Sequence, residues 1–241
     1  MKHVLRKASF GLAVATLSAM TVADVTASLQ LSNMYLFRGE DLGTGDALIA
    51  GSLDAEKNGA YIGMWAASGD ATLGQEIDFY GGYAFTSEDG NFGVDVGALT
   101  YYYPGANSYD VFGSLSEAYI TFDVFGAFAE VWKTVADDGG DADHNFYYVL
   151  GYEHNGFTVY AGYLNTDMEV ATVDGMEDKD YVHIDASFTT SDVPGELDDS
   201  LTIGFSQIVH QSADRDDVIT ASDFREEDLL MYVSYDVSFD L

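Results

Sequence analysis

The chain has 241 residues, a formal net charge of −32 at pH 7, 47% hydrophobic residues and no cysteine. Nucleic-acid binding needs a basic face that neutralises phosphates, so this charge excludes nucleic acid as a partner. The lack of cysteine excludes disulfide scaffolds and thiolate metal sites, and a hydrophobic fraction of this size is ordinary for a folded chain.

Residues 1–23 have the pattern of an export signal, with a basic start, an apolar stretch and a small-residue cleavage site after Ala23. Cleavage after Ala27 is the alternative. The basic start consists of Lys2, Arg6 and Lys7. The mature chain, residues 24–241, is then one domain with six basic residues against 41 acidic ones. It contains no stretch of about eighteen apolar residues that would form a membrane helix, so any membrane span must be β.

Along the mature chain, apolar and polar residues alternate in segments separated by turn signals. Successive side chains of a strand point to opposite faces, so this alternation predicts strands with one apolar face. We expect an all-β fold, a closed antiparallel transmembrane barrel of about twelve strands, with a range of about ten to fourteen. The expected strands cover 25–38, 49–56, 60–68, 76–85, 92–98, 116–122, 124–133, 145–153, 157–167, 180–189, 200–211 and 228–241, and the faces are ambiguous in 116–133.

The C-terminal strand has the clearest register. Odd positions from Leu229 to Leu241 are all apolar, and the even positions are largely polar. A soluble protein buries such an apolar face, whereas a membrane barrel turns it to lipid and turns its polar face to the lumen. Because the last strand must pair with the first to close a barrel, Phe239 and Leu241 are expected to matter for assembly.

Short and long links alternate between the expected strands, as in outer-membrane barrels with short periplasmic turns and longer outer loops. The link 190–199 is an exception, because it is long where a short one is expected. Aromatic residues near the strand ends suggest rings at the two membrane interfaces. These are Tyr35, Phe37, Tyr61, Trp65, Tyr101, Tyr102, Tyr103, Trp132 and Phe239.

Several stretches resemble the TorF-type porins of Gram-negative bacteria. They are Asn33–Gly39, Gly63–Ser68, Glu76–Tyr83, and Val94–Gly97 running into Tyr101–Gly105. The resemblance is specific over residues 25–105. It implies an outer-membrane β-barrel, and it supplies no catalytic residues.

Catalytic and metal sites have weak support in the sequence. His183 with Asp185, and Ser206 with His210, form partial catalytic patterns, but there is no Gly-x-Ser-x-Gly elbow. We therefore expect lumen or rim polar residues and no enzyme. The acidic runs 137–143 and 214–217 do not have the spacing of an EF-hand loop. They are expected to be solvated loops, and neither a metal nor another cofactor is assigned.

Charged residues on the predicted inward row are candidates for a constriction. Arg38 is expected to project into the lumen near the outer end of the first strand and to face Glu76 and Asp78. Such an arrangement sets a field across a pore, as charged rings do in selective channels. The alternative is an ion pair that braces the barrel. Further lumen candidates are Asp54, Glu56, Asp95 and Asp236.

These observations predict a protein of the Gram-negative outer membrane that acts as a narrow passive channel for small hydrophilic, cationic solutes. About eight strands give a lumen filled by side chains and about sixteen leave a broad channel, so the expected count falls between. One alternative is a side-chain-filled structural or surface-binding barrel without conductance, and another is a soluble periplasmic β-sandwich. The expected partners are outer-membrane lipid and lipopolysaccharide, the barrel assembly machinery and small solutes. A homo-oligomer is compatible with this prediction.

Overall fold

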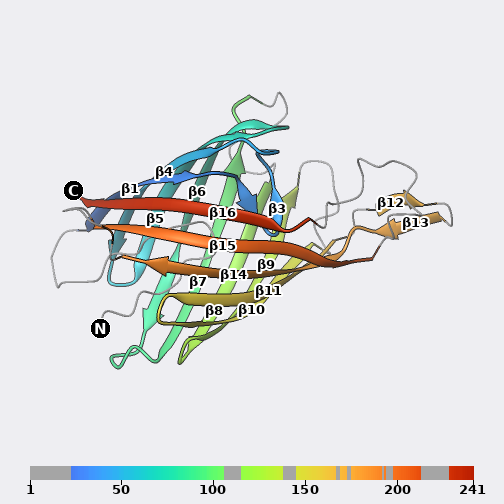
Figure 1. The fold of residues 1–241 in the computed structure, drawn as a ribbon. Coiled ribbons are helices and arrows are strands. Elements are labelled where there is room, and N and C mark those ends of the chain that lie inside the picture. Colours follow the sequence, from blue (N-terminus) through green and yellow to red (C-terminus); the bar gives the residue numbers. More distant parts are fainter. Residues whose placement is uncertain are drawn as a thin grey trace.

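The computed structural model describes residues 23–105, 115–137, 145–166, 169–172, 175–191, 193, 198–212 and 228–241, and the predicted signal segment 1–22 lies outside them. Twelve strands form a closed antiparallel barrel, shown in Figure 1. This confirms the predicted all-β class and the strand count. No helix of the described residues has the length and apolar character needed to span a bilayer.

The barrel strands follow the chain in order, and each expected strand corresponds to one of them. They are β1 (Asp24–Ser32), β4 (Leu48–Lys57), β5 (Ala60–Asp70), β6 (Gly74–Thr86), β7 (Phe92–Tyr102), β8 (Leu115–Val124), β9 (Ala127–Asp137), β10 (Phe146–His154), β11 (Phe157–Asn165), β14 (Tyr181–Thr190), β15 (Asp198–Gln211) and β16 (Leu230–Asp240). Two further pairs of short strands are β2 (Leu36–Phe37) with β3 (Glu40–Asp41), and β12 (Glu169–Thr172) with β13 (Gly175–Asp178).

The last strand closes the barrel against the first. In the β1–β16 ladder, Ala27 lies opposite Phe239, and the amide of Leu241 donates to the carbonyl of Val25 at 2.9 Å. On its other side β1 pairs with β4, so neither end of the sheet is left as an edge. A two-sheet sandwich would keep such edges. The structure therefore distinguishes the barrel from the predicted sandwich alternative.

Side chains alternate between the outside and the inside of the barrel as the sequence pattern predicts. Apolar residues dominate the outside and stay exposed there, for example Ile62 at 67% and Leu150 at 70%. On β16, Val233 and Phe239 are exposed by 45% and 41%. Val237 has the same orientation in the ladder, opposite Leu29, although its own side chain is only 4% exposed.

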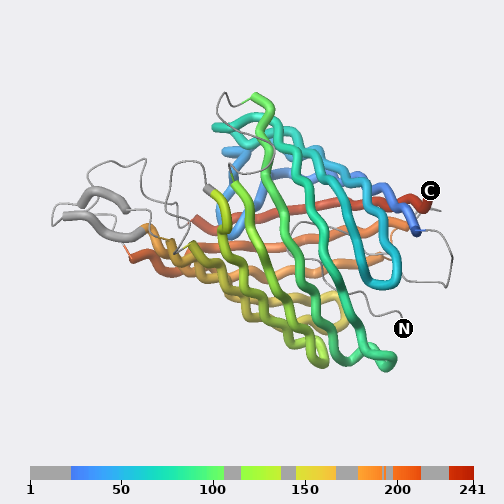
Figure 2. Tube along the Cα trace, turned by 180° about the vertical axis from the view of Figure 1, so that it is seen from behind, coloured from blue at the N-terminus to red at the C-terminus, as the bar shows by residue number. Residues whose placement is uncertain are grey.

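The two ends of the barrel differ in their connections. At the turn end, strands are joined by tight turns such as Asn58–Gly59, Phe125–Gly126 and Asn155–Gly156, and the long link 191–197 joins β14 to β15 there. The first residue of β1 and the C-terminal residue also lie at this end (Figure 2). At the loop end the links are longer, beginning with 33–47 between β1 and β4. The turn expected at 123–124 lies two residues later, because Gly126 tolerates the positive φ of 83° that the turn requires.

The predicted aromatic girdle is wrong for most of its members. Tyr35, Tyr61, Trp65 and Trp132 point into the barrel and are at most 6% exposed, and Tyr101 and Tyr103 are also buried. Inward rings and girdle rings occur at similar positions near strand ends, so sequence position alone does not separate them. The exposed rings of the turn end are Tyr83, Phe85, Phe92, Phe122, Phe125, Tyr152, Phe157, Phe188 and Phe239.

Candidate functional site: the bore and its inward hairpin

The segment after β1 folds into the bore, and this corrects the prediction of a first strand that continues to residue 38. The strand ends at Ser32, where Asn33 is bonded to β16 through both its backbone amide and its side chain, with Val233 and Met231 as partners. Met34 and Tyr35 then turn inward and are 9% and 3% exposed. We call residues 33–47 the inward hairpin.

The tip of the inward hairpin is a tight turn between β2 and β3. Phe37 pairs with Glu40, and the two residues between them, Arg38 and Gly39, have φ angles of 48° and 89°. Positive φ at both central residues is the geometry of the type I′ turn that favours hairpins. This turn gives Arg38 its direction, away from the base of the hairpin.

The inward hairpin crosses the bore from one wall to the other. At its base Tyr35 packs on Trp65 with ring centroids 6.0 Å apart, and its hydroxyl donates to Glu76 Oε2 at 2.5 Å. The hairpin begins between β1 and β4, whereas its tip contacts β8, β9, β10 and β14. In the ring of twelve strands β9 stands six places from β1, which is the opposite side. The hairpin is therefore a crossbar inside the barrel.

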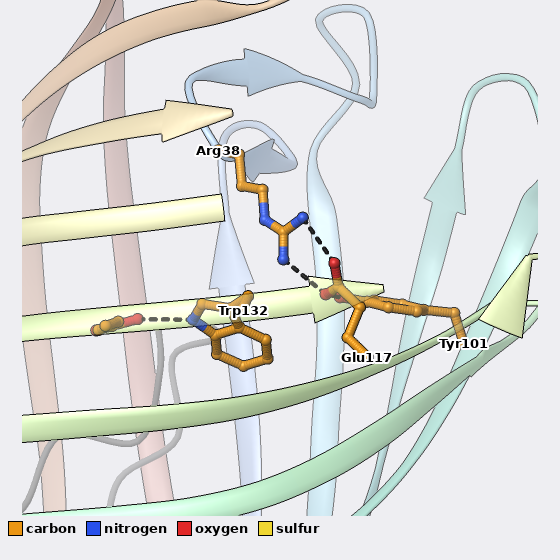
Figure 3. Close-up of polar contacts among 5 residues, drawn as sticks. Arg38, Tyr101, Glu117 and Trp132 are labelled. Carbon is orange, nitrogen blue, oxygen red and sulfur yellow. Dashed lines mark hydrogen bonds and ion pairs between the residues drawn. The ribbon is translucent and has the colours of Figure 1, made fainter. Parts of the chain in front are cut away.

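Arg38 forms an ion pair at the far wall. Its two terminal nitrogens donate to Glu117, with Nη1 to Oε1 at 3.0 Å and Nη2 to Oε2 at 2.6 Å, as Figure 3 shows. The side chains of Arg38 and Glu117 are 12% and 5% exposed. The Arg38 guanidinium carbon also lies 4.4 Å from the Tyr147 ring centroid and 5.8 Å from that of Trp132.

The predicted partners of Arg38 are therefore wrong. Glu76 and Asp78 do point inward from β6, at 1% and 3% exposure, but Glu76 is bonded to Tyr35 near the base of the hairpin. Glu117 was not predicted as a lumen residue, because it falls in residues 116–133, where the inward and outward faces of the strands are ambiguous. The available signal was the row of Glu117, Tyr119 and Thr121 on β8, which alternates with the apolar residues at 118, 120 and 122.

A second set of contacts holds the tip of the hairpin against β14. The hydroxyl of Tyr181 donates to the carbonyl oxygen of Arg38 at 2.8 Å. Gly39 lies directly on His183, since a Cβ at Gly39 would be 2.7 Å from Cβ and Cγ of the histidine. His183 is fully buried, with Nδ1 2.5 Å from Asp185 Oδ2 and Nε2 2.9 Å from the Tyr147 hydroxyl.

The partial catalytic patterns are not joined into a nucleophile and base. His183 and Asp185 are bonded, but the second nitrogen of His183 is bonded to Tyr147, while Ser206 Oγ lacks a hydrogen-bond partner. Activation of a serine requires the free nitrogen of such a histidine to accept the hydroxyl proton. His210 is exposed near the loop end of β15.

The part of the chain that the structure describes contains no group of three or more His, Asp or Glu side chains placed to hold a metal ion. The acidic runs 137–143 and 214–217 lie outside the described residues except for Asp137.

The remaining predicted lumen residues all point inward, but their exposure differs. Asp95 on β7 is 1% exposed and accepts a bond from the Tyr61 hydroxyl at 2.7 Å. Asp54, Glu56 and Asp236 are only half-buried. Asp54 accepts bonds from Tyr80 and Ser52, and Asp236 accepts one from Ser234.

Four adjacent strands, β15, β16, β1 and β4, carry half-buried polar side chains on their inward row. We call this side of the bore the polar strip, and it consists of Ser200, Thr202, Asp236, Ser238, Thr26, Ser28, Gln30, Asp54 and Glu56. We call the opposite side the packed wall, with the buried residues Glu117, Phe128, Glu130, Trp132, Tyr147, Tyr181, His183 and Asp185 on β8, β9, β10 and β14.

Several inward rings lie flat against the barrel instead of standing across it. A Cβ at Gly63 would overlap the Tyr80 ring, one at Gly151 would overlap the Phe128 ring, and one at Gly204 would overlap the Tyr232 ring. Each of these glycines is on a strand that neighbours the aromatic residue. The missing side chain lets the ring cover the neighbouring strand, so these rings fill less of the bore than their size suggests.

Residues 16–182 match the family model of a bacterial protein of unknown function, Gcw_chp. This span exceeds half of the chain, so the chain belongs to that family. It contains the inward hairpin, Glu117, Trp132 and Tyr147, and it ends just before His183. A search of curated proteins found no match. The resemblance to TorF-type porins stays a prediction.

Proposed function

We propose that the protein is a narrow, cation-preferring passive channel of a bacterial outer membrane, with the inward hairpin as its constriction. The closed barrel, its exposed apolar outside and the aromatic rings at the turn end support a membrane location. We propose the turn end as the periplasmic side, because short turns face the periplasm in barrels of this kind.

The polar strip is the observation that carries this proposal. Its side chains are short, uncharged or acidic, and partly open to solvent, unlike the buried packed wall. Asp54, Glu56 and Asp236 place negative charge on this open side, whereas Arg38 is engaged by Glu117. Carboxylates along a low-dielectric passage enrich cations and deplete anions.

The inward hairpin sets the size limit of the proposed channel. It crosses the bore with Tyr35 and Arg38 each bonded to the barrel, so solutes pass beside it and not through an open cylinder. A barrel of twelve strands has a moderate bore before anything folds into it. We therefore propose passage of small ions and small polar solutes, and a role in transport instead of catalysis.

The second candidate is a filled barrel without conductance. The burial of inward charged residues such as Glu76, Asp95 and Asp185, each 1% exposed, favours it. In that case the bore serves as a polar core that stabilises the barrel, and contacts with lipopolysaccharide or another partner would be made outside it.

Single-channel recording in planar bilayers, with the reversal potential measured in a KCl gradient, separates the two candidates. The channel proposal predicts discrete conductance and a reversal potential of the sign for K⁺ preference. Asp89→Asn is a matched control, since it removes one carboxylate from an exposed turn outside the bore and should leave the potential unchanged. Anion preference or absence of conductance in well-folded protein would overturn the proposal, and the latter would support the filled barrel.

The proposed partners follow from the same location. The barrel assembly machinery would act on the C-terminal strand, where Phe239 and Leu241 are exposed by 41% and 76%. Comparing outer-membrane insertion of the wild type with that of Phe239→Ser tests this step, and equal insertion would contradict it.

A further inference from the structure

The guanidinium of Arg38 occupies a box built from the opposite wall of the barrel. Glu117 forms the floor with two hydrogen bonds, and the Tyr147 and Trp132 rings form the sides. Figure 3 shows the Arg38 side chain extending from the hairpin toward Glu117 and Trp132. A carboxylate that takes a guanidinium at both nitrogens, flanked by aromatic faces, is the arrangement by which proteins recognise organic cations.

The parts of the box are held in place by contacts that do not involve Arg38. Tyr101 donates to Glu117 Oε2 at 2.7 Å, and the indole nitrogen of Trp132 donates to Glu130 Oε2 at 3.0 Å. The Tyr147 hydroxyl is bonded to His183 Nε2 at 2.9 Å. All these groups belong to the barrel strands. The box would therefore keep its shape if the arginine left it.

The occupant belongs to a different structural unit from its box. Arg38 is on the turn of a hairpin whose two strands have two residues each. The tip contacts the far wall through side chains, the Gly39 backbone and one carbonyl oxygen. By contrast, Glu117, Trp132 and Tyr147 are on long strands that pair on both sides. Withdrawal of the tip would vacate the box without breaking the barrel.

We infer that this box is a binding site for small organic cations bearing a guanidinium or primary ammonium group, and that Arg38 is its tethered occupant. This inference rests on the proposed function in one respect, because the solute would reach the site through the bore. A free cation competes with Arg38 for Glu117. Neutral and anionic solutes are rejected, since they leave the buried Glu117 charge without a counter-ion.

Ligand binding to an Arg38→Ala protein tests the site directly. In a Trp65→Phe background, Trp132 is the one remaining tryptophan of the chain and reports on the box. Methylguanidinium at millimolar concentration should change its fluorescence saturably and raise the temperature at which the folded band is lost on a gel. At about 100 times Kd the rise should be on the order of 5–10 °C. N-methylurea, a neutral compound of similar shape, and NaCl at equal ionic strength are the controls.

A second substitution checks that the response comes from the box. Arg38→Ala with Glu117→Gln should weaken methylguanidinium binding at least about tenfold, since the charge-assisted bonds are lost. Arg38→Ala with Asp89→Asn loses a carboxylate far from the box and should bind as Arg38→Ala does. If Arg38→Ala does not fold, Arg38→Gln replaces it in the same series. A missing response, or one that survives Glu117→Gln, overturns the inference.

These experiments test the cation site and the channel independently, so failure of one proposal can be distinguished from failure of the other. The fluorescence measurement is made in detergent and needs no channel activity. A protein that binds methylguanidinium but carries no current would keep the site and overturn the channel. A protein that conducts K⁺ but binds no methylguanidinium would keep the channel and overturn the site.

Discussion

The two sides of the bore differ in the burial and bonding of their inward side chains, although both are built from alternating strands. On the packed wall, aromatic rings and carboxylates are bonded to one another and to the tip of the hairpin, and His183 and Asp185 are at most 1% exposed. On the polar strip, side chains such as Ser28 and Gln30 bond across the strands and stay partly solvated. The packed wall holds the tip of the crossbar, and the polar strip lines the other side of the bore.

Closure of the barrel underlies both sides, and breaking it should have the largest effect. Deleting residues 233–241 removes most of the β16 pairing with both β1 and β15. The open edges left behind cannot be satisfied in lipid, so we expect no folded barrel at all. Wild-type protein should migrate differently on a denaturing gel before and after boiling. A truncated protein that still shows this shift in the outer membrane would contradict the closure.

The packed wall should be sensitive to loss of the Arg38–Glu117 ion pair with the hairpin. Arg38→Ala leaves Glu117 buried without a counter-ion, which we expect to lower the free energy of unfolding by about 3–5 kcal/mol. Arg38→Ala with Glu117→Gln should recover part of this loss, because the uncompensated charge is gone. Urea titration followed by tryptophan fluorescence measures both. An Arg38→Ala protein as stable as the wild type would show that the pair does not brace the barrel.

Much of the barrel was predictable from alternation, while the crossbar was not. The side chains of Tyr35 and Phe37 continue the odd-numbered apolar row of β1, so the pattern of an inward hairpin and that of a longer strand are identical there. What ends β1 is the bonding of Asn33 to β16, about 200 residues later in the chain, with separations of 198 and 200 residues. A local sequence pattern cannot predict a contact between residues that are so far apart in the chain.

The ambiguous faces of residues 116–133 have a related physical cause. Alternation is clear where one face meets lipid and the other meets water, as on β16. On β8 and β9 the inside is itself a packed interior, so Phe128 and Trp132 share the inward row with Glu117 and Glu130. Apolar residues then occupy both faces, and the period-two signal is lost. The partner of Arg38 lay in this stretch.

Seating of the hairpin tip can be tested at one glycine with a matched control. Gly39→Ala should destabilise the protein by about 1–3 kcal/mol, because the methyl would overlap His183 and φ is positive. Gly45 has a similar φ of 97° but open space around it. Gly45→Ala therefore measures the backbone strain alone. If the two variants lose equal stability in urea titration, Gly39 does not pack on β14.

Cation preference should depend more on the polar strip than on the buried acids. Asp54→Asn with Glu56→Gln removes carboxylates that solvent reaches, whereas Glu76→Gln with Asp78→Asn changes groups that are at most 3% exposed. The first pair should shift the reversal potential further toward zero. The preference itself should fade at about 1 M salt, where the screening length is about 3 Å. A larger shift from the Glu76 and Asp78 pair would place the ion path beside the hairpin base.

The smallest expected effect concerns a carboxylate that lies outside both the packed wall and the polar strip. In the turn between β6 and β7, Asp89 accepts bonds from the Ser87 hydroxyl at 2.7 Å and the Asn91 side chain at 2.9 Å, and these lower its pKa to about 2. A lowered pKa in the folded state stabilises the protein above the ordinary pKa of aspartate, and the contribution disappears as pH falls through about 2. Asp89→Asn should therefore reduce stability slightly at pH 7 and make no difference near pH 2, as urea titrations at the two pH values would show. The full exposure of Asp89 keeps the effect small, in contrast to the buried Glu117. A loss at pH 7 as large as that of Arg38→Ala would mean that burial is not what makes the packed wall sensitive.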